Sequence, residues 1–313
     1  MKKIILSLAA SLAMFAGIAA PAAADGERFV LVSHAPDSDS WWNTIKNAIN
    51  VAGQQMGVTV EYRNPPTGDL ADMARIIEQA AASKPTGIIS TIADFDVLSG
   101  PLGNAVAQGI PVITINSGTE EQSKKIGALM HVGQPERDAG FGAGEKAKAA
   151  GVTKFLCVNH YITNPASVER CQGYADALGV ELGSQMIDSG LDPAEVKSKV
   201  LAYLQANPDT NGILTLGPNS AEPTIAALSE SGKAGTIHFG TFDLSPEIAK
   251  AIKGDVIAFA IDQQPYLQGY LPVVILTNYA RYGVVPGNSI NSGPGFVTKD
   301  NIALVEKFAG EYR

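Results

Sequence analysis

Residues 29–49 read FVLVSHAPDSDSWWNTIKNAI and combine an apolar run, a polar turn and a helical pattern. The run Phe29–Val32 is apolar on both faces and rich in residues that favour strands. After the turn, Trp42, Ile45 and Ile49 recur at the spacing of one helix face. The stretch therefore predicts a buried strand followed by a helix that covers it.

This strand–helix unit repeats along the chain. A first series continues with strand-like runs at 58–60, 87–89 and 111–115, and a second has runs at 154–158, 185–187, 212–216, 236–239 and 256–261. Runs that are apolar on both faces and separated by helices are typical of parallel sheets covered on both sides. The two series predict an α/β protein with two doubly wound parallel-sheet domains. A long helix after Ile261, a Gly- and Pro-rich connection at 287–296 and a final helix at 298–312 complete the expected order.

The first 24 residues have the pattern of an export signal. Lys2 and Lys3 precede an uncharged apolar run, 4–19, and the alanines at 22–24 offer small residues to a peptidase. The run is shorter than the ~20 residues that a membrane span needs, which disfavours an uncleaved anchor. We expect cleavage before Asp25 and a soluble mature protein in the periplasm.

The mature chain is expected to be acidic and without catalytic motifs. Loss of Lys2 and Lys3 takes the formal net charge from −8 to −10. Such a charge repels nucleic acid and anionic lipid headgroups, so we expect neither as a partner. The sequence lacks His-Glu-x-x-His, Gly-x-Ser-x-Gly and Ser-x-x-Lys. The stretch 140–148, GFGAGEKAK, resembles a phosphate loop, but it lacks the Gly-Lys-Ser/Thr ending and fits helix packing better.

The cysteine and histidine content gives no metal pattern. Two cysteines and four scattered histidines show no zinc-ligand spacing, so we expect neither a metal nor another cofactor. Cys157 lies in a strand-like run and Cys171 in the helical pattern that follows. In an oxidising compartment the two can form a disulfide, and buried thiols acting as small hydrophobes are the alternative.

Polar side chains follow most of the predicted strands. In open α/β sheets, ligands bind beyond the carboxyl ends of the strands. Asn, Asp, Gln and Arg can donate to or accept from neighbouring hydroxyls in pairs, although each alone is more often a turn residue or a cap. The residues at these ends are Asn116, Ser117, Asn159, His160, Asn219, Asp243, Asp262, Gln263 and Gln264.

The chain has two tryptophans, Trp41 and Trp42, directly after the first turn. Adjacent helical positions differ by about 100°, so Trp42 continues the apolar stripe while Trp41 starts off it. Asp39 or Ser40 is the expected N-cap of this helix. An indole face packs well against the C–H face of a sugar, and burial of both rings in the core is the alternative. Arg170, near the start of a later helix, is expected either to pair with Asp243 or to be exposed.

These features together resemble the periplasmic sugar-binding proteins of ABC importers, of the ribose/galactose/fructose type, over essentially the whole mature chain. The matching motifs are Asp39 with Trp41 and Trp42 after the first strand, Asn116 in VITINSG, Arg170 in ERCQGY, Asp243 in GTFD and Gln263 in IDQQP. The chain departs from the ribose-type pattern in a longer SHAPDSD turn, in Asn116–Ser117 where that pattern has Asp-Arg, and around Asn219.

The resemblance implies the type I periplasmic binding protein fold, with two lobes joined by a hinge of several crossovers. The expected lobes are 25–132 plus 264–291 and 133–263 plus 292–313. It implies a monomeric, non-enzymatic protein that captures a monosaccharide or polyol between the lobes and delivers it to the transmembrane subunits of an ABC permease. The implied ligand-binding residues are Asp39, Trp41, Trp42, Asn116, Arg170, Asn219, Asp243 and Gln263.

Two other functions remain open at this stage. A periplasmic receptor with the same fold can present a sugar-like signal to a chemoreceptor or a sensor kinase. A secreted carbohydrate-active enzyme needs two carboxylates about 5–10 Å apart across a glycosidic bond. The acids of this sequence are better explained as acceptors for hydroxyl groups.

Overall fold

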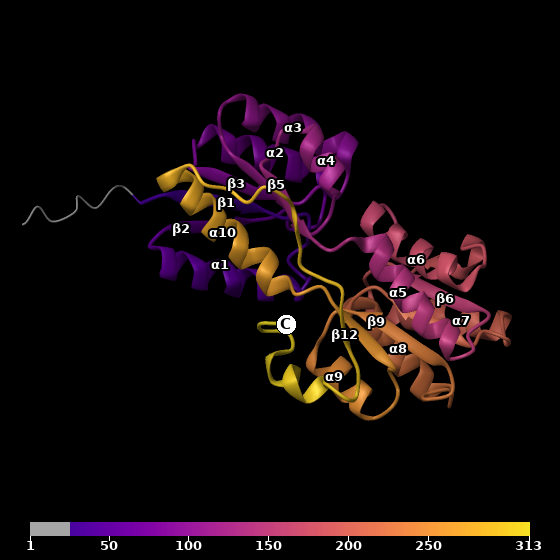
Figure 1. Ribbon diagram of the computed structural model, residues 1–313. Helices are drawn as coiled ribbons and strands as arrows, with labels where there is room; N and C mark the ends of the chain where they lie inside the picture. The colour runs from indigo at the N-terminus through magenta and orange to yellow at the C-terminus, as the bar shows by residue number, and fades with distance from the viewer. Residues whose placement is uncertain (1–25) are drawn as a thin grey trace, which may run out of the picture.

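The computed structural model describes residues 26–313, which form two lobes of similar construction (Figure 1). The predicted export signal and its cleavage site lie outside the described residues. Each lobe has one six-stranded sheet with helices on both faces. Within the described residues, no helix is long and apolar enough to cross a membrane.

The first lobe is built on a parallel sheet of order β11-β5-β4-β3-β1-β2. Its strands are β1 (Arg28–Val32), β2 (Thr59–Arg63), β3 (Gly87–Ser90), β4 (Val112–Ile115), β5 (Met130–Gly133) and β11 (Ile290–Asn291). Helices α1 (Trp42–Met56) and α10 (Pro265–Tyr282) pack on one face, and α2 (Leu70–Ala82) and α3 (Phe95–Ala107) on the other. The short α4 (Glu120–Lys125) joins β4 to β5.

The second lobe repeats this order as β12-β10-β9-β8-β6-β7, with β12 antiparallel to β10. Its strands are β6 (Phe155–Asn159), β7 (Met186–Asp188), β8 (Gly212–Thr215), β9 (His238–Phe242), β10 (Phe259–Asp262) and β12 (Gly295–Val297). Helices α5 (Glu136–Ala149) and α6 (Pro165–Leu178) cover one face. Helices α7 (Pro193–Ala206), α8 (Pro218–Glu230) and α9 (Pro246–Lys253) cover the other. The predicted fold class is confirmed.

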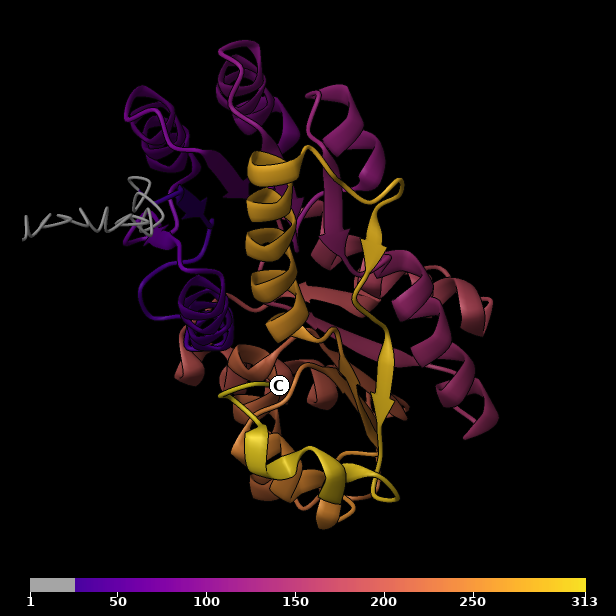
Figure 2. The same cartoon turned by 60° about the vertical axis from the view of Figure 1, so that its left-hand side comes forward.

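The hinge consists of several chain crossings. The chain passes between the sheets after β5, again after β10, and a third time between β11 and β12 (Figure 2). The last crossing was predicted only as a Gly- and Pro-rich connection, yet its two halves each add an edge strand, one to each sheet. Strand β5 was also missing from the predicted series.

The prediction of one final helix at 298–312 is wrong. The segment instead forms two short 3₁₀ helices, η2 (Ile302–Leu304) and η3 (Glu306–Phe308). Ile302 and Ala309 pack into the core of the second lobe, and Gly310 then adopts the left-handed conformation with φ of 77°. A residue in this conformation reverses the chain, so a continuous helix cannot extend through it.

Helices α5 and α6 approach each other closely through glycine. A Cβ on Gly140 would lie 2.1 Å from the backbone oxygen of Arg170, and one on Gly144 would lie 2.6 Å from that of Tyr174. Stretch 140–148 is therefore a packing surface within α5, as the sequence indicated. Cys157 and Cys171 form a disulfide between β6 and α6, which settles the alternative that the sequence left open.

Candidate ligand-binding site

The structure brings all the predicted ligand residues to one cavity between the lobes, which we call the inner cavity. Its volume is about 50 Å³. The first lobe supplies Asp39, Trp41, Trp42 and Asn116, the second supplies Arg170, Asn219 and Asp243, and the hinge supplies Gln263. They converge because the strands of both sheets end toward the interlobe space, as the topology of open α/β sheets requires.

The two indoles form an edge-to-face pair at the inner cavity. Their ring centroids are 5.2 Å apart and their planes differ by 78°. Trp42 is 2% exposed and packs with Ile45 in the core beneath α1, whereas Trp41 is partly exposed. Helix α1 begins at Trp42, and the carboxylate of Asp39 accepts the backbone N–H of Trp41 at 3.2 Å. Trp41 is therefore the indole with more free surface.

A chain of side-chain hydrogen bonds links the lobes through the hinge. The amide nitrogen of Asn116 donates to Gln263 Oε1 at 3.1 Å, and Gln263 Nε2 donates to Asp243 Oδ1 at 2.8 Å. Asn116 and Asp243 both have left-handed backbones, with φ of 57° and 65°. Asn and Asp tolerate this conformation better than other residues with a side chain, and such backbones gather at functional sites.

Arg170 is buried, at 7% exposure, and does not hydrogen-bond Asp243, so neither alternative drawn from the sequence describes it. Its guanidinium instead forms a bidentate ion pair with Glu136, with Nε–Oε2 and Nη2–Oε1 distances of 2.7 and 2.8 Å. Nη1 donates to the carbonyl of Leu216 at 3.0 Å. The close packing of α5 on α6 brings Glu136 to this position. A guanidinium has five N–H donors, so donors remain for a ligand in the inner cavity.

Burial controls the protonation of the acids in the inner cavity. It raises the pKa of Asp243 to about 7, although the nearby charge of Arg170 and the hydrogen bond from Gln263 oppose the shift. Burial also raises the pKa of Asp39, against its hydrogen bonds with the Trp41 backbone and Asn219. Asp39 and Asn219 belong to different lobes, so this contact crosses the cleft.

Two histidines that the predicted ligand set omitted also line the inner cavity. Burial lowers the pKa of His34 to about 4 and that of His160 to about 3, so both are neutral at pH 7. His34 Nδ1 lies 3.0 Å from Thr91 Oγ1, and His160 Nδ1 lies 3.2 Å from Ser220 Oγ. Because Nδ1 of each ring is engaged by a protein hydroxyl, Nε2 is the nitrogen left to donate to or accept from a ligand hydroxyl group.

The turn after β6 supplies further lining residues that were missed. Tyr161 and Asn164 line the inner cavity, and Asn164 Nδ2 donates to Ser117 Oγ of the other lobe at 2.9 Å. The hydroxyl of Tyr161 is buried and has no hydrogen-bond partner among residues 26–313. This turn follows β6, which has the same position in the second sheet as β1 has in the first, and the turn after β1 carries the tryptophans. The repeated strand order in the sequence could therefore have identified Tyr161 and Asn164 as lining residues.

The chemistry of the inner cavity is that of a binding site for a polar ring. Among the residues that the structure describes, no three His, Cys, Asp or Glu side chains are grouped as a metal site. The walls combine an indole surface with carboxylate, amide, imidazole and guanidinium groups. Such a lining matches a ligand that has apolar C–H faces and hydroxyl groups at its edge.

Comparison with known proteins agrees with this architecture. Residues 29–283 match the periplasmic binding protein domain. A carbohydrate transporter from Acidothermus cellulolyticus 11B, solved in complex with myo-inositol, is 32% identical with a TM-score of 0.84, over 91% of this chain and 98% of that chain. An ABC sugar transporter (periplasmic sugar binding protein) from Legionella pneumophila is 27% identical with a TM-score of 0.78, over 85% and 99% of the two chains.

A similarity also extends to a protein from an archaeon. The xylose/arabinose-binding protein XylF of Sulfolobus acidocaldarius is 26% identical over 258 residues, which are 77% of this chain and 64% of that protein. The match thus spans slightly less than two thirds of that relative's length. Since the match runs from β1 to the end of α10 and includes well over half of the chain, the chain belongs to the periplasmic binding protein domain family.

Proposed function

We propose that this protein captures a neutral monosaccharide or a related polyol in the inner cavity and delivers it to the transmembrane permease of an ABC importer. The observation that carries the proposal is the convergence of polar groups and an indole pair from both lobes and the hinge on one cavity. The sugar and myo-inositol ligands in the names of similar proteins support the same ligand class. The sequence pattern of an export signal in residues 1–24 supports a periplasmic location.

The charge of the inner cavity favours neutral ligands. The guanidinium of Arg170 is balanced by Glu136, while Asp39 and Asp243 have no cationic hydrogen-bond partner within the described residues. Carboxylates at a buried site accept hydroxyl groups well but repel a phosphate or a uronate. We therefore infer that sugar phosphates and sugar acids bind much more weakly than neutral sugars.

Capture uses movement of the two lobes, 25–132 plus 264–291 and 133–263 plus 292–313. A volume of about 50 Å³ is far below the ~300–1,000 Å³ usual for ligand sites, so entry of a sugar requires the lobes to part. A ligand shifts the equilibrium toward the closed arrangement because only that arrangement offers contacts from both sides. A Kd of about 1 μM corresponds to about −8 kcal/mol, which several hydrogen bonds to charged groups and one indole contact can supply.

A thermal-shift panel of pentoses, hexoses, deoxysugars, polyols and sugar acids tests the proposal. A ligand that binds only the folded protein raises its Tm, and we expect neutral compounds to give the shift. For the compound with the largest shift, Trp41→Ala should weaken binding at least tenfold in calorimetry. Tyr282→Ala is the matched aromatic control, since Tyr282 is 70% exposed at the far end of α10.

Two outcomes would contradict the proposal. One is the absence of any shift with neutral sugars and polyols, and the other is equal affinity of wild type and Trp41→Ala. The transport role has a separate test in the organism that produces the protein. Deletion of its gene should abolish uptake of the radiolabelled ligand, whereas a purely signalling receptor would leave uptake intact.

A further inference from the structure

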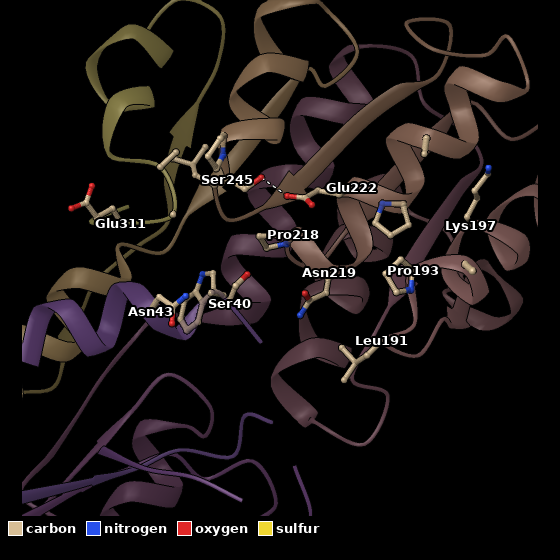
Figure 3. Close-up of a pocket in the computed structure, with 18 residues that line it drawn as sticks. Ser40, Asn43, Leu191, Pro193, Lys197, Pro218, Asn219, Glu222, Ser245 and Glu311 are labelled. Atoms are coloured by element: carbon tan, nitrogen blue, oxygen red, sulfur yellow. Dashed lines mark hydrogen bonds between the residues drawn. The ribbon is translucent and has the colours of Figure 1, made fainter. Parts of the chain in front are cut away.

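A second and larger hollow lies at the outer end of the inner cavity. This outer groove has a volume of about 710 Å³ and is lined by both lobes. Figure 3 shows Ser40 and Asn43 at the start of α1 facing Pro218 and Asn219 at the start of α8. The groove continues along the second lobe past Leu191 and Pro193 at the start of α7.

The outer groove and the inner cavity are adjacent. Trp41, Pro218 and Asn219 line both. The partly exposed indole of Trp41 therefore stands at the junction between a small polar chamber and a wide open one. These three residues form the boundary that a substituent on a ring in the inner cavity would cross to reach the outer groove.

The lining of the outer groove is mainly apolar. Carbon surfaces come from Leu191, Pro193, Ala194, Pro223, Ala226 and Leu244. Two of its three charged side chains are paired with protein groups: Glu222 accepts from Ser245 Oγ at 2.7 Å, and Lys197 forms an ion pair with Glu230. The third is Glu311. A second sugar ring needs several hydrogen-bonding partners, whereas an alkyl or aryl group gains from contact with such carbon surfaces.

We propose that the ligands of this protein include glycosides and ethers with an apolar substituent, the polar ring in the inner cavity and the alkyl or aryl group in the outer groove. This inference rests on the proposed function and specifies its ligand class. The sharing of Trp41, Pro218 and Asn219 by the two hollows, together with the contrast in their linings, carries it.

The test compares substituents on the ring that gives the largest thermal shift in the panel. The probes are the methyl, n-butyl and phenyl glycosides of that sugar in both anomers, or the corresponding O-ethers if it is a polyol. Each buried methylene increases affinity by up to about fourfold. In calorimetry we expect the butyl and phenyl derivatives of at least one series to bind at least tenfold more tightly than the methyl derivative.

A pair of isosteric variants tests whether the affinity gain of the butyl derivative arises in the outer groove. Asn43 and Asn50 are both exposed on α1, two turns apart, and of the two only Asn43 lines the outer groove. Asn43→Asp places a charge beside the substituent and should reduce the butyl-to-methyl affinity ratio at least threefold. Asn50→Asp adds the same charge outside the groove and should leave the ratio unchanged. Neither change should alter the affinity for the unsubstituted ring.

The possible results separate the two proposals. If the unsubstituted ring binds but its butyl and phenyl derivatives bind no more tightly than the methyl compound, the groove proposal is overturned and the proposed function stands. A gain with a disaccharide but not with the butyl compound also overturns it, as does an equal ratio in the two variants. If no ring binds at all, the proposed function itself fails.

Discussion

The fourth strands of the two lobes end in nearly the same way. In the first lobe β4 leads into Asn116, and in the second β9 leads into Asp243. Both residues have positive φ, and both donate their backbone N–H to the strand alongside, Asn116 to Val132 and Asp243 to Ile261. Gln263 then contacts both side chains. Asn116 and Asp243, which we call the two corners, thus occupy equivalent positions in the two lobes and lie on either side of the Gln263 amide.

The two corners differ in charge, and the two lobes also contribute different chemical groups to the inner cavity. Asn116 is neutral and donates to Gln263, while Asp243 is ionisable and accepts from it. The second lobe also contains the buried ion pair of Arg170 with Glu136 near its corner. The first lobe provides the indoles instead. We infer that the first lobe contributes the aromatic surface and one carboxylate, Asp39, whereas the second contributes the buried ion pair and Asp243.

The largest expected effect comes from breaking the ion pair of the second lobe. Arg170→Met leaves Glu136 buried, at 4% exposure, without its cation. Loss of one partner of a buried pair costs about 3–5 kcal/mol of stability. Urea unfolding at pH 7 measures this change. Adding Glu136→Gln removes the unpaired buried charge and should restore a large part of the lost stability. A cost below ~1 kcal/mol for Arg170→Met would show that the ion pair does not stabilise this lobe.

The charge difference between the corners predicts opposite pH effects in two exchange variants. Because the pKa of Asp243 is raised from 3.8 to about 7, the folded protein retains a proton between these values that the unfolded chain has released. Stability therefore falls as the pH rises through this range. Asp243→Asn removes the dependence, and its stability relative to wild type should increase from pH 4 to pH 7 by up to about 4 kcal/mol.

The reverse exchange is the control for this prediction. Asn116→Asp places a carboxyl group in the corresponding buried corner, so its stability relative to wild type should decrease over the same pH range. Urea unfolding at half-unit pH steps measures both series. Parallel pH profiles for wild type and Asp243→Asn would contradict the assignment of a raised pKa to Asp243.

Removal of the Gln263 amide, which hydrogen-bonds both corners, has a smaller expected effect on stability. Gln263→Met removes the amide and leaves Asn116 and Asp243 each without one buried partner. Unpaired buried polar groups cost about 1–3 kcal/mol. In the Asp243→Asn background the cost should be lower, since a neutral amide is less expensive to leave unpaired than a carboxylate. A double-mutant cycle in urea gives the coupling, and a coupling near zero would mean that the two corners are energetically independent.

The sequence was sufficient to predict which side chains meet, because strand ends are encoded locally. Asn116, Asp243 and Gln263 each follow an apolar run, and a parallel sheet brings such ends to one edge. The partner of Arg170 was predicted wrongly because Glu136 lies 34 residues earlier on another helix. Only the packing of glycine in α5 against α6 determines that contact, and no local pattern states which helices will touch.

The turn after β6 and the last segment show two other limits of local patterns. His160 and Tyr161 lack the conspicuous indole pair of their counterpart turn, although the repeated strand order makes the two turns equivalent. The final segment has the composition of a helix, but packing of Ile302 and reversal at Gly310 override that preference. Tertiary contacts decide such cases over intrinsic propensity.

The smallest effect concerns the helices that follow the two corners, where the lobes should behave alike. Thr119 accepts the N–H of Gln122 at 3.1 Å to cap α4, and Ser245 accepts that of Ile248 at 3.2 Å to cap α9. Thr119→Ala and Ser245→Ala should each cost about 1 kcal/mol in urea unfolding, since this is the usual contribution of an N-cap. Thr119 has only neutral partners, so its cost should be independent of pH between 4 and 7, whereas Ser245→Ala also removes the hydrogen bond to Glu222, so its cost should be compared in a Glu222→Gln background. A pH-dependent cost at Ser245 that persists in the Glu222→Gln background would show that the electrostatic difference between the lobes extends beyond Asp243 into α9.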